Sequence, residues 1–467
     1  MGNHKINDAL AAPDIPPCPS KSLSNFLEGV DQPDENKWAD CVHCGMCLES
    51  CPTYLETGHE HQSPRGRVHL IKAVSEGKIE LNEQFMDPVF TCLDCRACET
   101  ACPANVQVGG LIEEARGQVR KAMPLKGWKG SMHKVFLRGI FPYPNRLHTL
   151  GRLLQFLQKS GLESFAKKTG MLNILPQHLR DMEAVMPKVQ KPVMKKYPKV
   201  NPAEGPTKQR VAMLTGCVMD VMFSDVNEAT LRVLTRNGYE VTVPREQRCC
   251  GALHIHAGDR EEGRRLAKQN IDAFKDCEKV IVNAAGCGCA LQEYPELFRE
   301  DPEYREKAEA FANKVVDVSK FLIDSGYRKP KAEVNTRVTY HDACHLAHGQ
   351  GVRSEPRQLL HDIPGVEMVD LPNSDRCCGS AGIYNLTNPE MAGAVLDRKM
   401  EDIPDNIEMI SMGNPGCMLQ MAIGVCRHGR SEKVVHTIQL LDWAYEKEES
   451  LKKDKMDIVT IGRETDV

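Results

Sequence analysis

The stretch 41-CVHCGMCLESCP-52 carries four cysteines separated by two, two and three residues, with a proline after the last. The same spacing returns at 92-CLDCRACETACP-103, so the four cysteines of each run match at a constant offset of 51 residues. Three thiolates this close together can wrap one corner of a cubane iron–sulfur cluster, while the fourth reaches a second cluster. The two stretches therefore predict an internal repeat that holds two [4Fe–4S] clusters.

In two-cluster ferredoxins the fourth cysteine of each run binds the cluster of the other run. The expected ligand sets are Cys41, Cys44, Cys47 and Cys102 for one cluster, and Cys92, Cys95, Cys98 and Cys51 for the other. Zinc also accepts four thiolates, but its sites usually come as two well-separated Cys-x-x-Cys pairs. Four close cysteines followed by a proline therefore favour iron–sulfur clusters over zinc.

The overall composition excludes several classes of protein. Lysine and arginine number 60 against 64 acidic residues, and aromatic residues make up 5%, so we expect no nucleic-acid partner. The first 20 residues lack the apolar core of a signal peptide, and no apolar run approaches the roughly 20 residues that span a bilayer. We therefore expect a cytoplasmic chain whose 20 cysteines stay reduced, so that they can act as ligands and do not form disulfides.

Composition also suggests a division of the chain into six segments. Strand-like stretches at 211–215, 239–244, 279–285, 337–341, 366–372 and 408–414 alternate with helix-like ones, which indicates α/β units with parallel sheets. The expected fold class is α+β and α/β, a helical two-cluster ferredoxin-like domain followed by two α/β repeats. The expected segments are a polar arm (1–40), the ferredoxin-like domain (41–122), a helical segment with a Pro/Lys-rich linker (123–210), two repeats (211–330 and 331–447) and a charged tail (448–467).

Eight more cysteines repeat along the second half of the chain. Cys217, Cys249, Cys250 and Cys287 match Cys344, Cys377, Cys378 and Cys417 at offsets of 127 to 130 residues. Each lies just after a predicted strand, where α/β folds usually build their sites. Adjacent cysteines can reach two irons of one cluster, and the glycine after each pair lets the backbone come close. Buried structural cysteine is the alternative, but two copies in register favour metal ligands.

Taken together, these motifs resemble the iron–sulfur subunit of bacterial glycolate oxidase over about residues 38–445. The iron–sulfur subunit of anaerobic glycerol-3-phosphate dehydrogenase, lactate-utilisation proteins and heterodisulfide reductase subunits share the layout. The resemblance is carried by 64-PRGRVHLIK-72, 249-CCGALHIHAGD-259, 283-NAAGCG-288, 340-YHDACHLAHGQGVRS-354, 377-CCGSAGIYNLTNPEM-391 and 414-NPGCMLQ-420.

The resemblance implies an electron-transfer subunit of a glycolate or other 2-hydroxy-acid oxidase. A partner subunit with FAD would oxidise the substrate, and the clusters here would pass electrons to a quinone or another carrier. A third subunit is part of the expected complex, and no catalytic residue is expected on this chain, which lacks dinucleotide-binding, P-loop and nucleophile-elbow motifs. The alternatives are a subunit of a lactate or glycerol-3-phosphate dehydrogenase, or a heterodisulfide-reductase-like catalytic subunit.

The repeat endings depart from the heterodisulfide reductases, in which each repeat closes with Cys-x-x-Cys. The first repeat here ends in Cys287-Gly-Cys289, and the second ends in Cys417 alone, with Cys426 nine residues on. These endings do not favour disulfide-cleaving chemistry, and they leave the number and type of clusters in this half open. Cys18 and Cys277 lie outside every motif and are expected to be plain thiols.

Several other residues allow two interpretations each. Arg65 and Arg67 either neutralise cluster charge or are solvated residues at a helix start. The basic, apolar stretch 126–144, with Trp128, Phe136 and Phe141, either contacts the inner face of the cell membrane or packs as an ordinary helix. Five histidines beside the motif cysteines are ligands or hydrogen-bonded neighbours: His254, His256, His341, His345 and His348.

Overall fold

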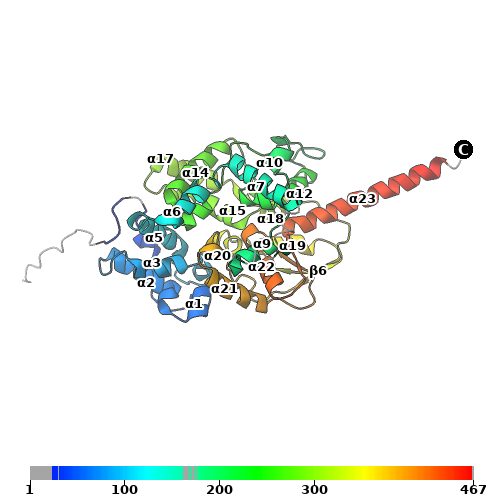
Figure 1. Cartoon of the computed structure of the whole chain (residues 1–467). Coiled ribbons are helices and arrows are strands. Elements are labelled where there is room, and N and C mark those ends of the chain that lie inside the picture. The colour runs from blue at the N-terminus through cyan, green and yellow to red at the C-terminus, as the bar shows by residue number, and fades with distance from the viewer. Residues whose placement is uncertain (1–23, 30, 161–167, 170–173, 175, 465–467) are drawn as a thin grey trace, which may run out of the picture.

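The computed structural model describes residues 24–464 except 30, 161–167, 170–173 and 175 (Figure 1). A helical region comes first, and two parallel-sheet units follow it, which confirms the expected fold class. The helical region packs beside both sheet units, and the last helix projects from the body (Figure 1). No described helix has both the length and the apolar character needed to cross a bilayer.

The first region is built from short helices around a small apolar core. Ser63 caps α2 by accepting from the backbone N–H of Gly66, and Pro64 fills the first helical position, where no donor is needed. Phe85, Ile71 and Leu111 pack between the helices. The elements are η1 (Glu35–Lys37), α1 (Pro52–Thr57), η2 (Glu60–Gln62), α2 (Pro64–Ser75), α3 (Glu83–Thr91), α4 (Ala97–Thr100) and α5 (Val108–Ala122).

Residues 24–40, which we expected to lie in a loose polar arm, instead pack against the body. Phe26 and Trp38 are buried in the core of the helical region. The carboxylate of Asp31 is buried between the guanidinium groups of Arg260 and Arg264, which hold its pKa well below the usual range against the opposing effect of burial. Apolar anchors and this ion pair therefore order the segment. Residues 1–23 lie outside the described residues.

A set of helices connects this region to the first sheet. His148 on α7 meets Asp220 at 2.9 Å between their side-chain atoms, and both are buried. Arg427 on α22 (Pro415–Arg427) pairs with Asp181 on α9 at 2.7 Å. These contacts join the connecting segment to both sheet units. The elements are α6 (Gly127–His133), the π-helix η3 (Lys134–Arg138), α7 (Pro144–Lys159), α9 (Gln177–Ala184) and α10 (Val193–Lys196).

The first sheet has the strand order β1-β3-β2-β4-β5, with all neighbours parallel except the pair β1 and β3. Its strands are β1 (Val200–Asn201), β2 (Gln209–Leu214), β3 (Tyr239–Thr242), β4 (Val280–Val282) and β5 (Val315–Asp317). Its helices are α11 (Val218–Met222), α12 (Ser224–Arg236), α13 (Ala252–His256), α14 (Arg260–Ala273), α15 (Ala285–Gln292), α16 (Tyr294–Leu297), α17 (Pro302–Ala312) and α18 (Val318–Ser325).

The second sheet is fully parallel, in the order β7-β6-β8-β9. This order repeats β3-β2-β4-β5 of the first sheet, so the two units share one topology. Its strands are β6 (Thr336–Tyr340), β7 (Val366–Val369), β8 (Met409–Met412) and β9 (Lys433–His436). Its helices are η5 (His345–Gly349), α19 (Ser354–His361), α20 (Tyr384–Thr387), α21 (Pro389–Glu401), α22 (Pro415–Arg427) and α23 (Thr437–Glu464).

All six predicted strands end one to three residues earlier than the sequence pattern predicts. β4 stops at Val282 and β8 at Met412, three and two residues before the predicted ends at 285 and 414. The remaining residues turn into α15 and α22, whose first turns carry Cys287 and Cys417. β7 likewise stops at Val369, short of the predicted end at 372. The early ends bring the first turns of α15 and α22, with their cysteines, close to the carboxyl edges of the sheets.

The two sheet units share one apolar core, and α23 fastens them together. Asp442 on α23 pairs with Arg232 and Arg236 on α12 of the first unit. Tyr445 on α23 accepts a hydrogen bond from Asn237 at 3.2 Å. The first turns of α23 therefore belong to the packed body, in contrast to the end of the helix, which projects from it (Figure 1).

Candidate metal centres

The two cysteine runs of the helical region adopt the same backbone path. His43 and Asp94 have φ angles of 55° and 52°, and Gly45 and Arg96 have 87° and 62°. These left-handed residues stand at matching positions of the two runs, and the left-handed region is uncommon for any residue other than glycine. The two left-handed residues on either side of the second cysteine curl each loop, so the backbone confirms the internal repeat.

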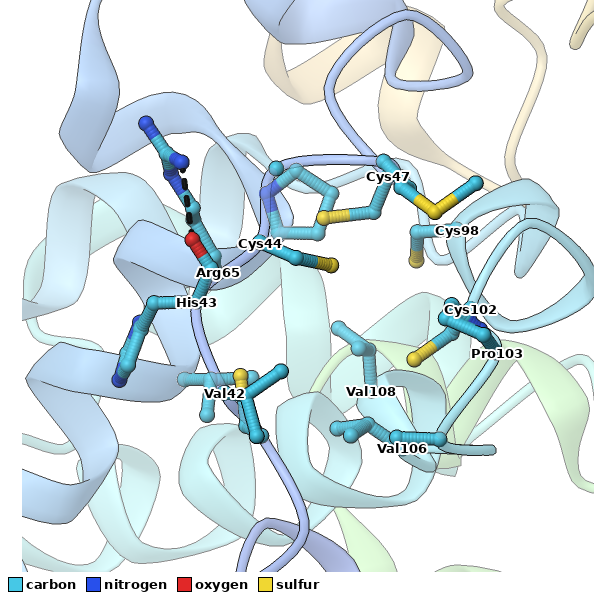
Figure 2. Close-up of a pocket in the computed structure, with 16 residues that line it drawn as sticks. Val42, His43, Cys44, Cys47, Arg65, Cys98, Cys102, Pro103, Val106 and Val108 are labelled. Atoms are coloured by element: carbon cyan, nitrogen blue, oxygen red, sulfur yellow. Dashed lines mark hydrogen bonds between the residues drawn. The ribbon is translucent and has the colours of Figure 1, made fainter.

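Each curled loop turns its thiols into a pocket. Figure 2 shows the sulfurs of Cys44, Cys47, Cys98 and Cys102 pointing toward one another in the first pocket. Cys41 also lines this pocket, and Val106 and Val108 form its apolar wall. A second pocket is lined by Cys51, Cys92, Cys95 and Cys98. The structure thus gathers the four thiols of each predicted ligand set, and Cys98 lies at the wall that the two pockets share.

Arg67 lies against the second pocket and is 1% exposed. Its guanidinium donates to the carbonyl of Pro88 at 2.7 Å and to Thr53 Oγ1 at 2.9 Å. A further N–H points at Cys51 Sγ from 3.7 Å. Burial works to lower the pKa of Arg67, but the thiols of Cys92 and Cys51 raise it above its usual value. Of the two interpretations of Arg67, the structure favours the charge-neutralising one, because the residue is a buried cation beside the predicted ligands.

Arg65, two residues earlier on the same helix, is placed differently. Its guanidinium pairs with Glu60 at 2.6 Å and donates to the carbonyl of His43 at 3.1 Å. A side chain on Gly45 would collide with it at 2.8 Å, so the glycine leaves space for this arginine over the first loop. Arg65 is therefore partly exposed and stabilises the loop, whereas Arg67 is a buried positive charge beside the thiols.

The four motif cysteines of the first repeat gather at the carboxyl ends of β2, β3 and β4. Cys217 Sγ lies 3.5 Å from Cys249 Sγ, and Cys250 Sγ lies 3.2 Å from Cys287 Sγ. Tyr294 donates to the carbonyl of Cys250 at 2.8 Å and so fixes the peptide between Cys250 and Gly251. Contact with Cys249, together with burial, raises the pKa of Cys217 well above its usual value.

The second repeat builds the same arrangement from its own four cysteines. Contact with Cys377, together with burial, raises the pKa of Cys344 well above its usual value. Cys378 contacts both Cys377 and Cys417. At Gly379, with φ +89°, a Cβ would lie 2.6 Å from the carbonyl oxygen of Ala392, so only glycine allows this turn.

The donor chemistry fits metal binding in both repeats. The thiols are packed against one another, and each thiolate would repel the next in the absence of a cation. A bound metal ion deprotonates a coordinating thiol outright, because its charge outweighs the cost of burial. None of the described cysteines is joined in a disulfide. Four converging free thiols in each repeat therefore suit iron or another thiophilic metal.

A cysteine of the helical region contacts a cysteine of the second repeat. Cys95, of the second pocket, is in hydrogen-bonding contact with Cys377, and both are buried. Tyr384 closes this junction from α20 by donating to the carbonyl of Thr91 at 2.7 Å. Leu93 and Val395 seal it with apolar contacts. The junction places the second-repeat thiols next to the second pocket.

Asn414 links the two repeats, and sequence reasoning did not single it out. Its side-chain amide donates to Cys417 Sγ at 3.4 Å, while its Oδ1 accepts from the backbone N–H of Gly286 at 3.2 Å. Gly286 directly precedes Cys287 of the first repeat. One side chain therefore joins the turns that carry Cys287 and Cys417. Its position before Pro415 at the start of α22 marks a helix entry but gives no indication of this bridge.

The remaining cysteines lie apart from these groups. Cys289 is buried near Arg96, which opposes the rise that burial causes in its pKa. Cys277 packs at the edge of the large core, and Cys426 is exposed on α22. The positions of Cys289 and Cys426 agree with the expectation that the repeat endings differ from Cys-x-x-Cys sites. Cys18 lies outside the described residues.

Each of the five histidines has a polar partner. His254 bonds to the carbonyl of Leu137 at 2.6 Å. His256 meets Asp94 at 3.0 Å, and His348 is held by the carbonyl of Asp375 at 3.1 Å. His345 approaches Cys344 Sγ at 3.5 Å through Nδ1 and packs its ring against His256. His341 differs, because a ring nitrogen lies within 4.8 Å of two thiols, those of Cys378 and Cys417.

Comparison with known families agrees with the order of these parts. Residues 37–106 match the 4Fe-4S dicluster domain, which confirms an iron–sulfur cofactor for the helical region. Residues 211–292 and 338–422 both match the cysteine-rich domain model. Residues 128–186 match the linker region of glycolate oxidase iron-sulfur subunits.

Relatives named as glycolate oxidase iron-sulfur subunits match nearly the whole chain. The "Probable glycolate oxidase iron-sulfur subunit" of Bacillus subtilis is 44% identical over 430 residues, which cover 90% of this chain and 96% of the relative. The glycolate oxidase iron-sulfur subunit of Escherichia coli is 32% identical over 87% of this chain and 94% of its own. Lactate utilization protein A of Oceanobacillus iheyensis is 34% identical but matches only 50% of this chain.

Proposed function

We propose that this chain, which belongs to the family of glycolate oxidase iron–sulfur subunits, carries electrons within a 2-hydroxy-acid oxidase complex. The substrate of the complex is glycolate, and a partner subunit with FAD oxidises the glycolate. The acceptor is a membrane quinone or another carrier, and a third subunit completes the complex. The identities over nearly the full chain support this assignment above the lactate and glycerol-3-phosphate alternatives.

The observation that carries the proposal is the continuity of the sulfur groups. Cys98 lines both pockets of the helical region, Cys95 contacts Cys377, and Asn414 joins the turns of Cys417 and Cys287. Iron–sulfur clusters accept electrons one at a time, so a series of them divides the electron pair of a reduced flavin. The contacts favour the repeats as an extension of the path from the two pockets, above a role in docking alone.

The protein residues have distinct tasks in this path. The eight cysteines of the two pockets serve as ligands of two [4Fe–4S] clusters, in the two crossed sets that the spacing predicts. The eight cysteines of the repeats hold further iron–sulfur groups. Arg67 supplies a buried positive charge and an N–H toward Cys51, and hydrogen bonds to sulfur and local charge are among the factors that set cluster potentials. We further propose residues 41–122, 211–330 and 331–447 as the units that carry these groups.

The test uses the complex purified without oxygen from its own host through a tag on this chain. Glycolate is expected to bleach the iron–sulfur absorption within the turnover time, whereas D-lactate and glycerol 3-phosphate leave it unchanged. Bleaching by D-lactate or glycerol 3-phosphate instead would support the electron-transfer role but reject glycolate as the substrate. Failure of all three, with a flavoprotein present and dithionite still bleaching the clusters, would contradict the proposed electron donor.

We place the chain at the inner face of the cell membrane through α6 and η3. Trp128 is 72% exposed, and Met132, Val135 and Phe136 are exposed at helical spacing on the same side. Lys126 and Lys134 flank these side chains and suit anionic lipid headgroups. Phe141, which we expected to face lipid with them, instead packs against the buried cluster of Leu147 and Val221.

Replacing Trp128 by serine is expected to lower binding to anionic vesicles about tenfold or more, since burying one large apolar side chain contributes about 1.5–3 kcal/mol. Co-sedimentation of the complex with phosphatidylglycerol-containing vesicles measures this. Val200→Ser removes an exposed apolar side chain from β1, far along the chain, and serves as the control. Equal vesicle binding by both variants would count against this membrane contact.

A further inference from the structure

His341 directly follows β6 and is fully buried beside the second-repeat thiols. One of its ring nitrogens lies within 4.8 Å of the Sγ atoms of Cys378 and Cys417. These two cysteines come from different parts of the repeat, Cys378 from the Cys-Cys-Gly turn and Cys417 from the first turn of α22. Three donor atoms from three segments therefore converge on one point inside the protein.

The hydrogen bonds of the His341 ring identify its free lone pair. Nδ1 lies 3.1 Å from the backbone carbonyl of Ser374, which can only accept, so Nδ1 carries the proton. Nε2 is then the unprotonated nitrogen, and it has no hydrogen-bond partner among the described residues. Histidines that bind metals commonly donate their other N–H to a backbone carbonyl, which fixes both tautomer and ring orientation.

The spacing of the donors suits a shared metal. Metal–sulfur and metal–nitrogen bonds of about 2.3 Å and 2.0 Å at a tetrahedral centre put the two donor atoms about 3.5 Å apart. The donors of this group lie within 4.8 Å of one another before any metal draws them in. A buried imidazole with an unpaired nitrogen has lost its hydration without replacement, which destabilises the folded protein. A bond from Nε2 to iron offsets that cost.

We propose that Nε2 of His341 is a ligand of the iron–sulfur group in the second repeat, beside Cys378 and Cys417. The inference rests on the proposed function, since it requires an iron–sulfur group there. The first repeat has Leu214 three residues before its first cysteine, where the second repeat has His341. The two repeats therefore hold chemically different groups. Replacing thiolate by imidazole raises the reduction potential of an iron–sulfur cluster, so the second-repeat group would favour electrons more strongly than an all-thiolate one.

His345 is the rival ligand, because its Nδ1 lies 3.5 Å from Cys344 Sγ. That contact involves one thiol from the neighbouring residue, and the His345 ring also packs on His256 with 5.3 Å between ring centroids. His341 instead reaches two thiols from separate segments. Substituting each histidine in turn therefore distinguishes the two assignments.

The test is nitrogen hyperfine spectroscopy on the reduced whole complex, grown with ¹⁵N-histidine. Wild type is expected to show a strongly coupled histidine nitrogen, which His341→Leu loses and His345→Leu keeps. Leucine is the residue of the first repeat at this position, so the variant copies a packing that the chain already uses. Absence of the coupling in wild type, or its persistence in His341→Leu, would overturn the assignment.

Iron content and redox titration separate this inference from the proposed function. His341→Cys supplies a thiolate in place of the imidazole and is expected to retain iron while one midpoint potential shifts downward and the others stay unchanged. Full iron content with unchanged potentials would reject His341 as a ligand but leave the electron-transfer role standing. If Cys378→Ser leaves the iron content and every redox signal of the complex unchanged, the second repeat holds no such group and the assignment of His341 fails, while the two pockets of the helical region still support the electron-transfer role.

Discussion

Cys95→Ser is expected to reduce turnover of the complex with its natural acceptor by more than about 100-fold, since even residues that only support ligands contribute 10- to 100-fold. Cys95 lines the second pocket and also contacts Cys377, so the substitution breaks the path at its junction. Reduction of the partner flavin by substrate should continue at its normal rate. Stopped-flow absorbance of the flavin, beside steady-state turnover, measures the two steps separately.

Cys426→Ser is the matched control for this experiment. Cys426 is an exposed thiol on α22, away from the gathered cysteines, so turnover and iron content should stay at the wild-type level. If Cys95→Ser also stopped flavin reduction, the proposal that the partner flavin oxidises the substrate independently of this chain would be contradicted. Wild-type turnover in Cys95→Ser would instead remove the junction from the electron path.

Arg67→Met is expected to destabilise the helical region by about 3–5 kcal/mol, the range seen when one partner of a buried charged network is removed. The substitution leaves the Pro88 carbonyl, the Thr53 hydroxyl and the Gln62 amide oxygen without their donor. Thiolates of the second pocket also lose the cation beside them. The expected readouts are a lower denaturant midpoint and faster release of iron to a chelator.

Arg65→Met provides the comparison from the same helix. Its pair with Glu60 is largely exposed, and water and salt screen exposed ion pairs so that they contribute little to stability. Iron release from this variant should therefore stay close to the wild-type rate. Equal rates for the two variants would mean that the buried position of Arg67 has no special role. Arg67→Lys, which keeps the charge without the forked geometry, is expected to fall between Met and wild type.

Much of the site was predictable from spacing. A Cys-x-x-Cys-x-x-Cys run leaves its thiols little freedom beyond the curled loop that the structure shows, so the two pocket sets follow from local sequence. The repeated strands also place each Cys-Cys-Gly turn at the carboxyl end of a sheet, because successive parallel strands begin and end at the same edges. The packing of residues 24–40 was not predictable in this way, since Asp31 meets partners more than 200 residues away.

The sequence by itself determined the fold class, the two crossed groups of cysteines and the repeat of four further cysteines, because each depends on residue types at short, regular spacing. Tertiary structure decided how the groups meet. Tyr384 bonds to Thr91 across 293 residues of chain, and the contact of Cys95 with Cys377 lies at the same junction. Tertiary packing also buried Arg67 and aimed His341 at two thiols. No local pattern encodes these placements, since each results from packing between distant parts of one core.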